Sequence, residues 1–183
     1  LGDGSVVRAD IRTSNSGVTA AGMPLRIRFN VFDKASGCAP LAGAAVYAWH
    51  CDIDGRYSLY DGALTDVDYL RGVQDGDAGT VEFQSVFPGC YDGRWPHIHF
   101  EVFASIDEAT NGANAILTSQ IAFRQDVCEQ VYATDGYSTS LDNLSRVSLA
   151  GDNVFADGVE LQMGSMSGTM SDDDFTVALN VVV

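Results

Sequence analysis

The chain has 183 residues, of which 46% are hydrophobic, with 19 glycines and 4 prolines, and its formal net charge is −15. This charge argues against a nucleic-acid partner, because neutralising phosphate groups requires clustered lysine and arginine. No apolar run approaches the roughly 20 residues that a membrane-spanning helix needs, so we expect no membrane partner either.

Apolar residues alternate with polar ones in several segments, which is the pattern of a half-buried strand. In chain order the predicted strands cover residues 25–31, 44–50, 81–86, 97–103, 117–123, 159–163 and 175–181. Helical patterning is limited to 105–113 and 126–132, and the polar stretch 165–174 is typical of a hairpin loop. Short strands separated by Gly and Asp turns predict an all-β fold. We expect a single β-sandwich domain over residues 1–183, with short helices in connecting loops and a motif-bearing core at 20–125.

Two of the three histidines, His97 and His99, lie two residues apart in a predicted strand. Residues i and i+2 of a strand point to the same face, so both imidazoles can bind one metal ion. Tyr57 and Tyr91 follow turns and could add two phenolates. Free tyrosine has a pKa near ~10, so phenolate ligation needs a strongly acidic metal such as ferric iron.

Arg94 and Gln120 each have a functional and a structural interpretation. Arg94 precedes His97 by three residues and either stabilises an anionic substrate or is a solvated surface residue. Gln120 interrupts an apolar strand and is either a satisfied core amide or a hydrogen-bond partner behind the site. His50 and Cys51 could join the two histidines in a copper or zinc site.

The sequence contains four cysteines, Cys38, Cys51, Cys90 and Cys128, and none forms a CxxC pair. A structural zinc site is therefore not indicated. An even number of cysteines predicts two disulfides and an oxidising, extracellular location, with four buried thiols as the alternative.

Several motifs occur in an order that resembles the intradiol aromatic ring-cleavage dioxygenases, and the chain looks most like their secreted branch. The resemblance covers about 100 residues. The motifs are Gly22-Met23-Pro24-Leu25, the segment 40–52, Gly55-Arg56-Tyr57-Ser58, Tyr69-Leu70-Arg71-Gly72, Phe87-Pro88-Gly89-Cys90-Tyr91, the segment 94–100, and Thr118-Ser119-Gln120.

This resemblance implies one Fe(III) per chain, bound by Tyr57, Tyr91, His97 and His99. It implies a dioxygenase that uses O2 to cleave a small aromatic diol between its two hydroxylated carbons, giving a muconic-type diacid. Tyr91 would accept a substrate proton and Arg94 would stabilise the anionic ring. Gln120 falls on the family glutamine. The helical dimerisation region of many members has no counterpart before Gly22, which leaves a monomer and a dimer both open.

If Tyr57 and Tyr91 bind one ion, their chain segments must come together. This proximity favours a Cys51–Cys90 bridge, which leaves Cys38 to pair with Cys128. Two other functions remain open at this point. One is a copper or zinc enzyme that uses the His97 and His99 pair. The other is a non-catalytic β-sandwich module that binds glycans through its tryptophans and tyrosines.

Overall fold

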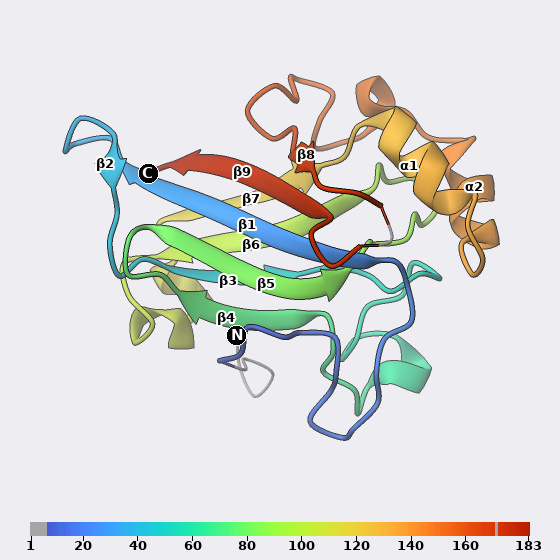
Figure 1. Ribbon diagram of the computed structural model, residues 1–183, viewed down its shortest axis with the longest axis horizontal. Helices are drawn as coiled ribbons and strands as arrows, with labels where there is room; N and C mark the ends of the chain where they lie inside the picture. The colour runs from blue at the N-terminus through green and yellow to red at the C-terminus, as the bar shows by residue number, and fades with distance from the viewer. Residues whose placement is uncertain (1–6, 171) are drawn as a thin grey trace.

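A computed structural model describes residues 7–170 and 172–183 as two β-sheets packed face to face (Figure 1). One sheet has the order β2-β1-β9-β8, and β5 also pairs with β1. The other has the order β4-β3-β6-β7. The pairing of β1 with β9 is parallel and the rest are antiparallel. The strands are β1 (Pro24–Asp33), β2 (Ala39–Pro40), β3 (Ala45–Trp49), β4 (Arg71–Asp75), β5 (Thr80–Val86), β6 (His97–Phe103), β7 (Leu117–Ala122), β8 (Ser165–Ser167) and β9 (Thr176–Val182).

The core lies between the two sheets and follows from the alternation of apolar residues. The alternate apolar side chains of β1 are buried, namely Leu25, Ile27, Phe29 and Val31, while Arg28 on the same strand is exposed. Phe29 of β1 and Phe100 of β6 meet with their ring centroids 4.9 Å apart. Because alternate strand residues face opposite sides, the sequence pattern determines which face of each strand is buried.

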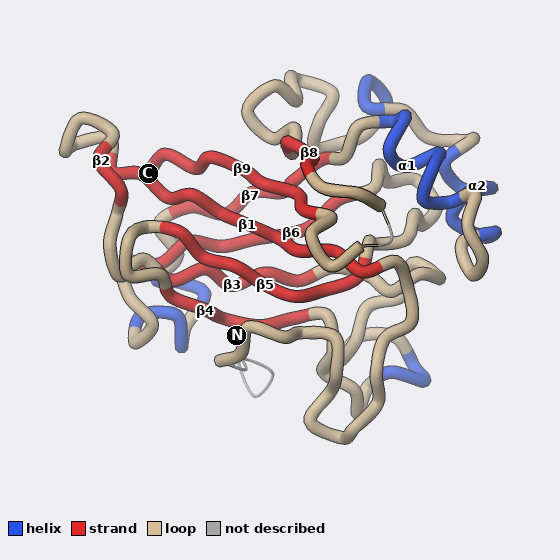
Figure 2. Tube along the Cα trace, in the orientation of Figure 1, coloured by secondary structure: helices blue, strands red, loops and turns tan. Residues whose placement is uncertain are grey.

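The helices lie outside the two sheets, and most of the remaining chain is loop (Figure 2). Helices α1 (Gln125–Tyr132) and α2 (Ser138–Leu144) lie together at one end of the sandwich (Figure 1). The described residues also include four short 3-10 helices: η1 (Gly62–Leu64), η2 (Glu108–Thr110), η3 (Gly112–Asn114) and η4 (Leu149–Gly151). In the described part of the chain, none of the helices has the length and apolar character needed to cross a bilayer.

Six of the seven predicted strands are confirmed, but the strand expected at 159–163 is wrong. This segment is a loop in which only Met163 makes an isolated bridge, to Ala122, and Leu161 is 91% exposed. Its alternation arises because Val159 and Met163 pack on the core from a loop. The candidate helix at 105–113 is replaced by η2 and η3, whereas the hairpin expected near 165–174 forms between β8 and β9.

The predicted disulfides are also wrong, because all four cysteines are free thiols. Cys38 is exposed in the turn after β1, whereas Cys128 is buried in α1 at the opposite end of the sandwich (Figure 1). Cys51 donates a hydrogen bond from Sγ to the Gly89 carbonyl at 3.5 Å. Burial raises the pKa of Cys90 to about 12, so this thiol stays protonated. The extracellular location, which rested on the bridges and on the resemblance to the secreted branch of the family, stays a prediction.

Removal of the Phe29 ring tests the packing between the sheets. Phe29 is fully buried, so Phe29→Ala leaves a cavity and is expected to lower the free energy of unfolding by about 3–5 kcal/mol. Leu161→Ala is the matched control and should change it by less than about 0.5 kcal/mol. Urea denaturation measures both. Equal effects of the two substitutions would contradict the core described above.

Candidate metal centre

Two loops carry the tyrosines, residues 50–61 and 87–96, and glycines allow them to pack tightly together. The peptide N–H of Gly89 donates to the Asp52 carbonyl at 3.1 Å, and a Cβ on Gly89 would lie only 2.5 Å from that oxygen. Gly55 has φ +81°, and a Cβ there would lie 2.7 Å from Cβ of Tyr91. Any larger residue would separate the loops, so both glycines are required for Tyr57 and Tyr91 to approach each other.

Helix α2 joins the same two loops from the side. The hydroxyl of Ser140, which is fully buried, donates to the Ile53 carbonyl at 2.8 Å and accepts from the Cys90 peptide N–H at 2.9 Å. The side-chain amide of Asn143 donates to the Cys90 carbonyl at 2.8 Å. These polar contacts, rather than a Cys51–Cys90 bridge, connect the tyrosine-bearing segments.

Four donor atoms converge where these loops meet the start of β6. Nε2 of His97 lies 3.3 Å from the phenol oxygen of Tyr57, 3.2 Å from that of Tyr91 and 3.1 Å from Nε2 of His99. The tyrosine rings meet edge to face, with centroids 5.7 Å apart. Ligand atoms bound about 2.0–2.2 Å from one ion fall about 3 Å from each other. The four side chains are therefore spaced as ligands of a single metal ion.

The imidazole orientations suit ligation through Nε2. His97 donates from Nδ1–H to the Trp95 carbonyl at 2.5 Å, which leaves the lone pair of Nε2 directed at the other donors. A carbonyl partner of this kind commonly fixes the tautomer of a metal-binding histidine. The His99 ring stacks on Trp49 with centroids 4.8 Å apart and planes at 6°, and Trp49 stacks in turn on Tyr47.

Burial keeps all four side chains neutral when no metal is bound. It lowers the pKa of His97 to about 4 and that of His99 to about 3. Burial also raises the pKa of the Tyr57 and Tyr91 phenols, although the nearby Arg94 guanidinium opposes the rise in both. The imidazoles are thus ready to bind a cation at neutral pH, whereas each phenol must first lose a proton.

Arg94 is held beside the four donors and is not a solvated surface residue, because its side chain is only 16% exposed. Its Nη2 donates to Oε1 of Gln120 at 2.6 Å, and its Nε donates to Oδ2 of Asp152 at 2.9 Å. Gln120 stands opposite His99 in the β6–β7 register. Gln120 is therefore a hydrogen-bond partner behind the site rather than a core amide.

His50 does not join the cluster. Its Nδ1–H donates to the Cys51 carbonyl at 2.8 Å, and its Nε2 accepts from the Ser85 hydroxyl at 2.6 Å, so both ring nitrogens are occupied. Across residues 7–170 and 172–183 there is no group of three or more His, Cys, Asp or Glu side chains that could hold a metal ion. A copper or zinc site that includes His50 and Cys51 is therefore wrong.

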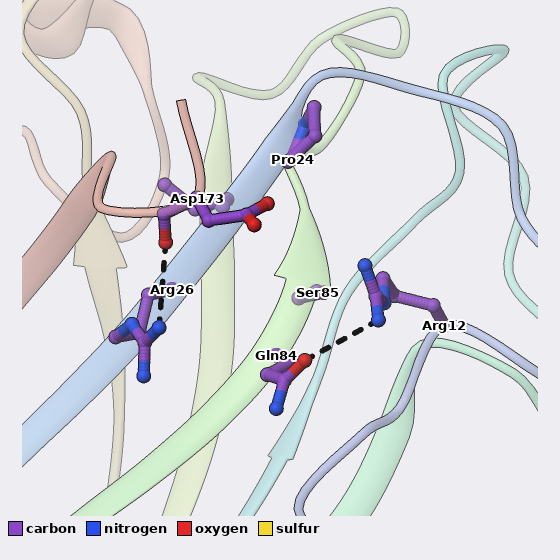
Figure 3. Close-up of a pocket in the computed structure, with 7 residues that line it drawn as sticks. Arg12, Pro24, Arg26, Gln84, Ser85 and Asp173 are labelled. Carbon is purple, nitrogen blue, oxygen red and sulfur yellow. Dashed lines mark hydrogen bonds between the residues drawn. The ribbon is translucent and has the colours of Figure 1, made fainter. Parts of the chain in front are cut away.

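The cluster opens onto a pocket of about 440 Å³ with aromatic walls, and the residues that line it are Trp49, Tyr57, Tyr60, Asp61, Tyr91 and His99. A second, smaller hollow of about 140 Å³ lies over β1 and β5 (Figure 3). Its arginines already have protein partners, since Arg12 pairs with Asp10 and Gln84, and Arg26 donates to the Asp173 carbonyl. The pocket of about 440 Å³ is the candidate active site because Tyr57, Tyr91 and His99 line it, whereas none of the four donors lines the hollows of about 140, 350 and 670 Å³ elsewhere.

Sequence reasoning missed several residues that shape this site. Trp49 carries the stack on His99, and Ser140 and Asp152 contact the loops from the last third of the chain. Trp49 lies in the segment 40–52 that carries the family resemblance, but the sequence assigned it no role in the site. No motif marks Ser140 or Asp152, which reach the site through tertiary contacts alone.

Comparisons with known proteins agree on one family. The sequence profile of a family described as Dioxygenase matches residues 3–135. Chlorocatechol 1,2-dioxygenase of Rhodococcus opacus is 37% identical over 68 residues, which is 37% of this chain and 26% of that enzyme. The chain thus spans about a quarter of the length of this curated relative.

Solved structures share the fold. An intradiol ring-cleavage dioxygenase from Tetranychus urticae superposes with a TM-score of 0.80 at 25% identity, covering 100% of this chain and 88% of that one. 3-Chlorocatechol 1,2-dioxygenase from Rhodococcus opacus 1CP superposes with a TM-score of 0.66 at 16% identity, covering 100% of this chain and 68% of that one.

The tautomer of His97 tests the geometry of the site without any metal. In metal-free protein we expect His97 to carry its proton on Nδ1 and to stay neutral from pH 7 down to about pH 5, because burial lowers its pKa to about 4. Nitrogen-15 NMR of the imidazole side chains measures both properties. A proton on Nε2, or a charged ring at pH 6, would contradict the arrangement of donors described above.

Proposed function

Since the chain belongs to the intradiol ring-cleavage dioxygenase family, we propose that it binds one ferric ion and cleaves catechols with O2 between their two hydroxylated carbons. The product would be a muconic-type diacid that contains both oxygen atoms. The observation that carries the proposal is the convergence of two phenols and two imidazoles on one point at the base of an aromatic pocket.

The chemistry of this donor set fits ferric iron. Zinc sites in proteins are built from Cys, His, Asp and Glu, and here Tyr57 and Tyr91 would have to supply half of the ligands. Phenolate is a hard oxygen donor, and hard donors favour highly charged cations. Because burial raises the pKa of both phenols, only a strongly acidic ion can displace their protons at neutral pH.

Tyr57, His97 and His99 would hold the ion, and Tyr91 would be the ligand that a substrate displaces. Ferric iron would supply Lewis acidity that favours the ionised form of the diol. The Tyr91 oxygen would accept a proton from one substrate hydroxyl. Burial favours this transfer, because a phenol whose pKa is raised above its usual value holds a proton firmly at neutral pH.

The remaining pocket residues would orient the ring and balance its charge. Trp49 and Tyr60 line the pocket, and a catechol ring would pack against the exposed Tyr60 ring, because Trp49 already stacks on His99 and Tyr47. Arg94 is a cation held rigidly behind Tyr91, and it would stabilise the negative charge that develops on the ring. Gln120 would fix the orientation of Arg94 through its amide oxygen.

The ligand assignment predicts a coloured iron protein. Tyrosinate bound to ferric iron absorbs visible light, so we expect a red to brown protein with about one iron per chain. His97→Ala and His99→Ala should lose iron, and Tyr57→Phe should lose or shift the visible band because phenylalanine has no donor oxygen. Metal analysis and absorption spectra measure this. Arg124→Ala, on the surface, is the control, and unchanged iron and colour in all three site variants would overturn the assignment.

The reaction itself is tested with isotopic oxygen. Iron-loaded protein supplied with catechol and ¹⁸O2 should release a ring-opened diacid that carries two labelled atoms, which mass spectrometry detects. His97→Ala protein treated in the same way is the control and should give no product. A ring-opened aldehyde would indicate cleavage outside the two hydroxylated carbons, and unconsumed catechol would show that the protein is not such an enzyme.

A further inference from the structure

We propose that Asp152 is a positioning residue that fixes the Arg94 guanidinium beside Tyr91. This inference rests on the role proposed above for Arg94. Asp152 follows η4, in a part of the chain where the sequence shows no recognisable motif. It lies 58 residues after Arg94, so only the fold brings the two side chains together.

The contact between the two side chains is short and shielded from water. Oδ2 of Asp152 accepts from Arg94 Nε at 2.9 Å and from the Trp95 peptide N–H at 2.7 Å. The Asp152 side chain is fully buried and that of Arg94 is 16% exposed. A charge-assisted hydrogen bond in such surroundings is stronger than one on the surface. The same carboxylate oxygen therefore orients the guanidinium and the backbone that leads to His97.

The second carboxylate oxygen keeps Asp152 itself from rotating. Oδ1 accepts from the peptide N–H groups of Val154 at 2.8 Å and Phe155 at 3.3 Å. Burial alone would raise the pKa of this carboxyl group, but its hydrogen bonds from Arg94, Trp95 and Val154 hold the pKa below its usual value. Asp152 is thus a fixed anion at neutral pH.

Gln120 holds Arg94 from the other side through Nη2, at 2.6 Å. Two of the three guanidinium nitrogens are thereby occupied by protein groups on opposite sides. Arg94 also opposes the rise in the pKa of Tyr91, through its charge and a side-chain hydrogen bond, so the guanidinium faces the phenol side of the site. A cation held in this way is already oriented when charge develops on the substrate, which is the condition under which electrostatic stabilisation is most effective.

The turn that Asp152 closes also touches a proposed metal ligand. Phe155 is buried, and its ring lies 6.4 Å from that of His97 in an edge-to-face arrangement. The alternative is therefore that Asp152 only stabilises this turn and the Trp95 backbone. The two interpretations predict different effects of Asp152→Asn on kcat in a protein that already lacks the Arg94 side chain.

A double-mutant cycle on the iron-loaded protein, with catechol as substrate, separates them. We expect Asp152→Asn to lower kcat by about 10–100-fold, less than the ~10²–10³ typical for loss of a stabilising donor itself. KM should change by less than about threefold, and iron content and the visible band should be unchanged. In an Arg94→Ala background, Asp152→Asn should cause no further loss of kcat, because a residue that acts only through Arg94 is then without effect.

Asp68→Asn is the matched control. Asp68 also accepts hydrogen bonds from a neighbouring segment, from the Ser14 hydroxyl at 2.6 Å and the Asn15 peptide N–H at 2.8 Å, and its side chain is 15% exposed. The Asp68→Asn variant should have a lower free energy of unfolding but an unchanged kcat. Equal loss of kcat from Asp152→Asn in the wild-type and Arg94→Ala backgrounds would overturn the inference, as would loss of iron in the single variant.

A measurement without iron or substrate completes the test. In metal-free wild-type protein, the Arg94 Nε–H should give an NMR signal that exchanges slowly with water. The signal is assigned by its absence in Arg94→Ala. In Asp152→Asn, this slowly exchanging signal should be lost. A signal that exchanges as fast as that of a free arginine would overturn the inference even if Asp152→Asn did not fold. If catechol is not consumed but the signal is protected, the proposed function fails while the Asp152–Arg94 contact stands.

Discussion

The site depends on the close contact between the two tyrosine-bearing loops, 50–61 and 87–96. Gly55 and Gly89 leave no room for a side chain at this contact, and Ser140 of α2 bonds to both loops through one hydroxyl. The strands contribute the histidines at fixed spacing, because His97 and His99 lie on one face of β6. The sheets therefore determine where the imidazoles lie, and the loop contact brings the phenols to them.

Removal from water then determines the chemistry of the assembled site. The same burial that lowers the pKa of His97 and His99 raises that of Tyr57 and Tyr91. Without a metal, the cluster carries no charge, although it lies within a protein of net charge −15. Binding a cation must therefore release two protons, which favours an ion that is strongly acidic. The stacked Trp49 and the fixed Arg94 complete a pocket with aromatic walls and one oriented positive charge.

Features that depend on nearby residues could be predicted from the sequence, and those that depend on distant ones could not. Period-two alternation identified β1, β3, β5, β6, β7 and β9, and the spacing of His97 and His99 predicted a shared face. The same rule failed at 159–163, because a loop that packs on the core can also alternate. Helix α2 was missed because Ser138–Leu144 is rich in residues with modest helix propensity. Asp152 was missed because it lies 58 residues after Arg94, and no local sequence pattern indicates a contact over that separation. The cysteine pairing was wrong because proximity of two loops does not require a covalent link.

The central claim is that Tyr57, Tyr91, His97 and His99 bind one ferric ion together. X-ray absorption spectroscopy of the iron-loaded protein tests it most directly, because the fine structure reports the atoms around iron. We predict a first shell of oxygen and nitrogen with the multiple-scattering signature of two imidazoles, the same in the surface variant Arg124→Ala. A shell that contains sulfur, or one with no imidazole contribution, would contradict the account.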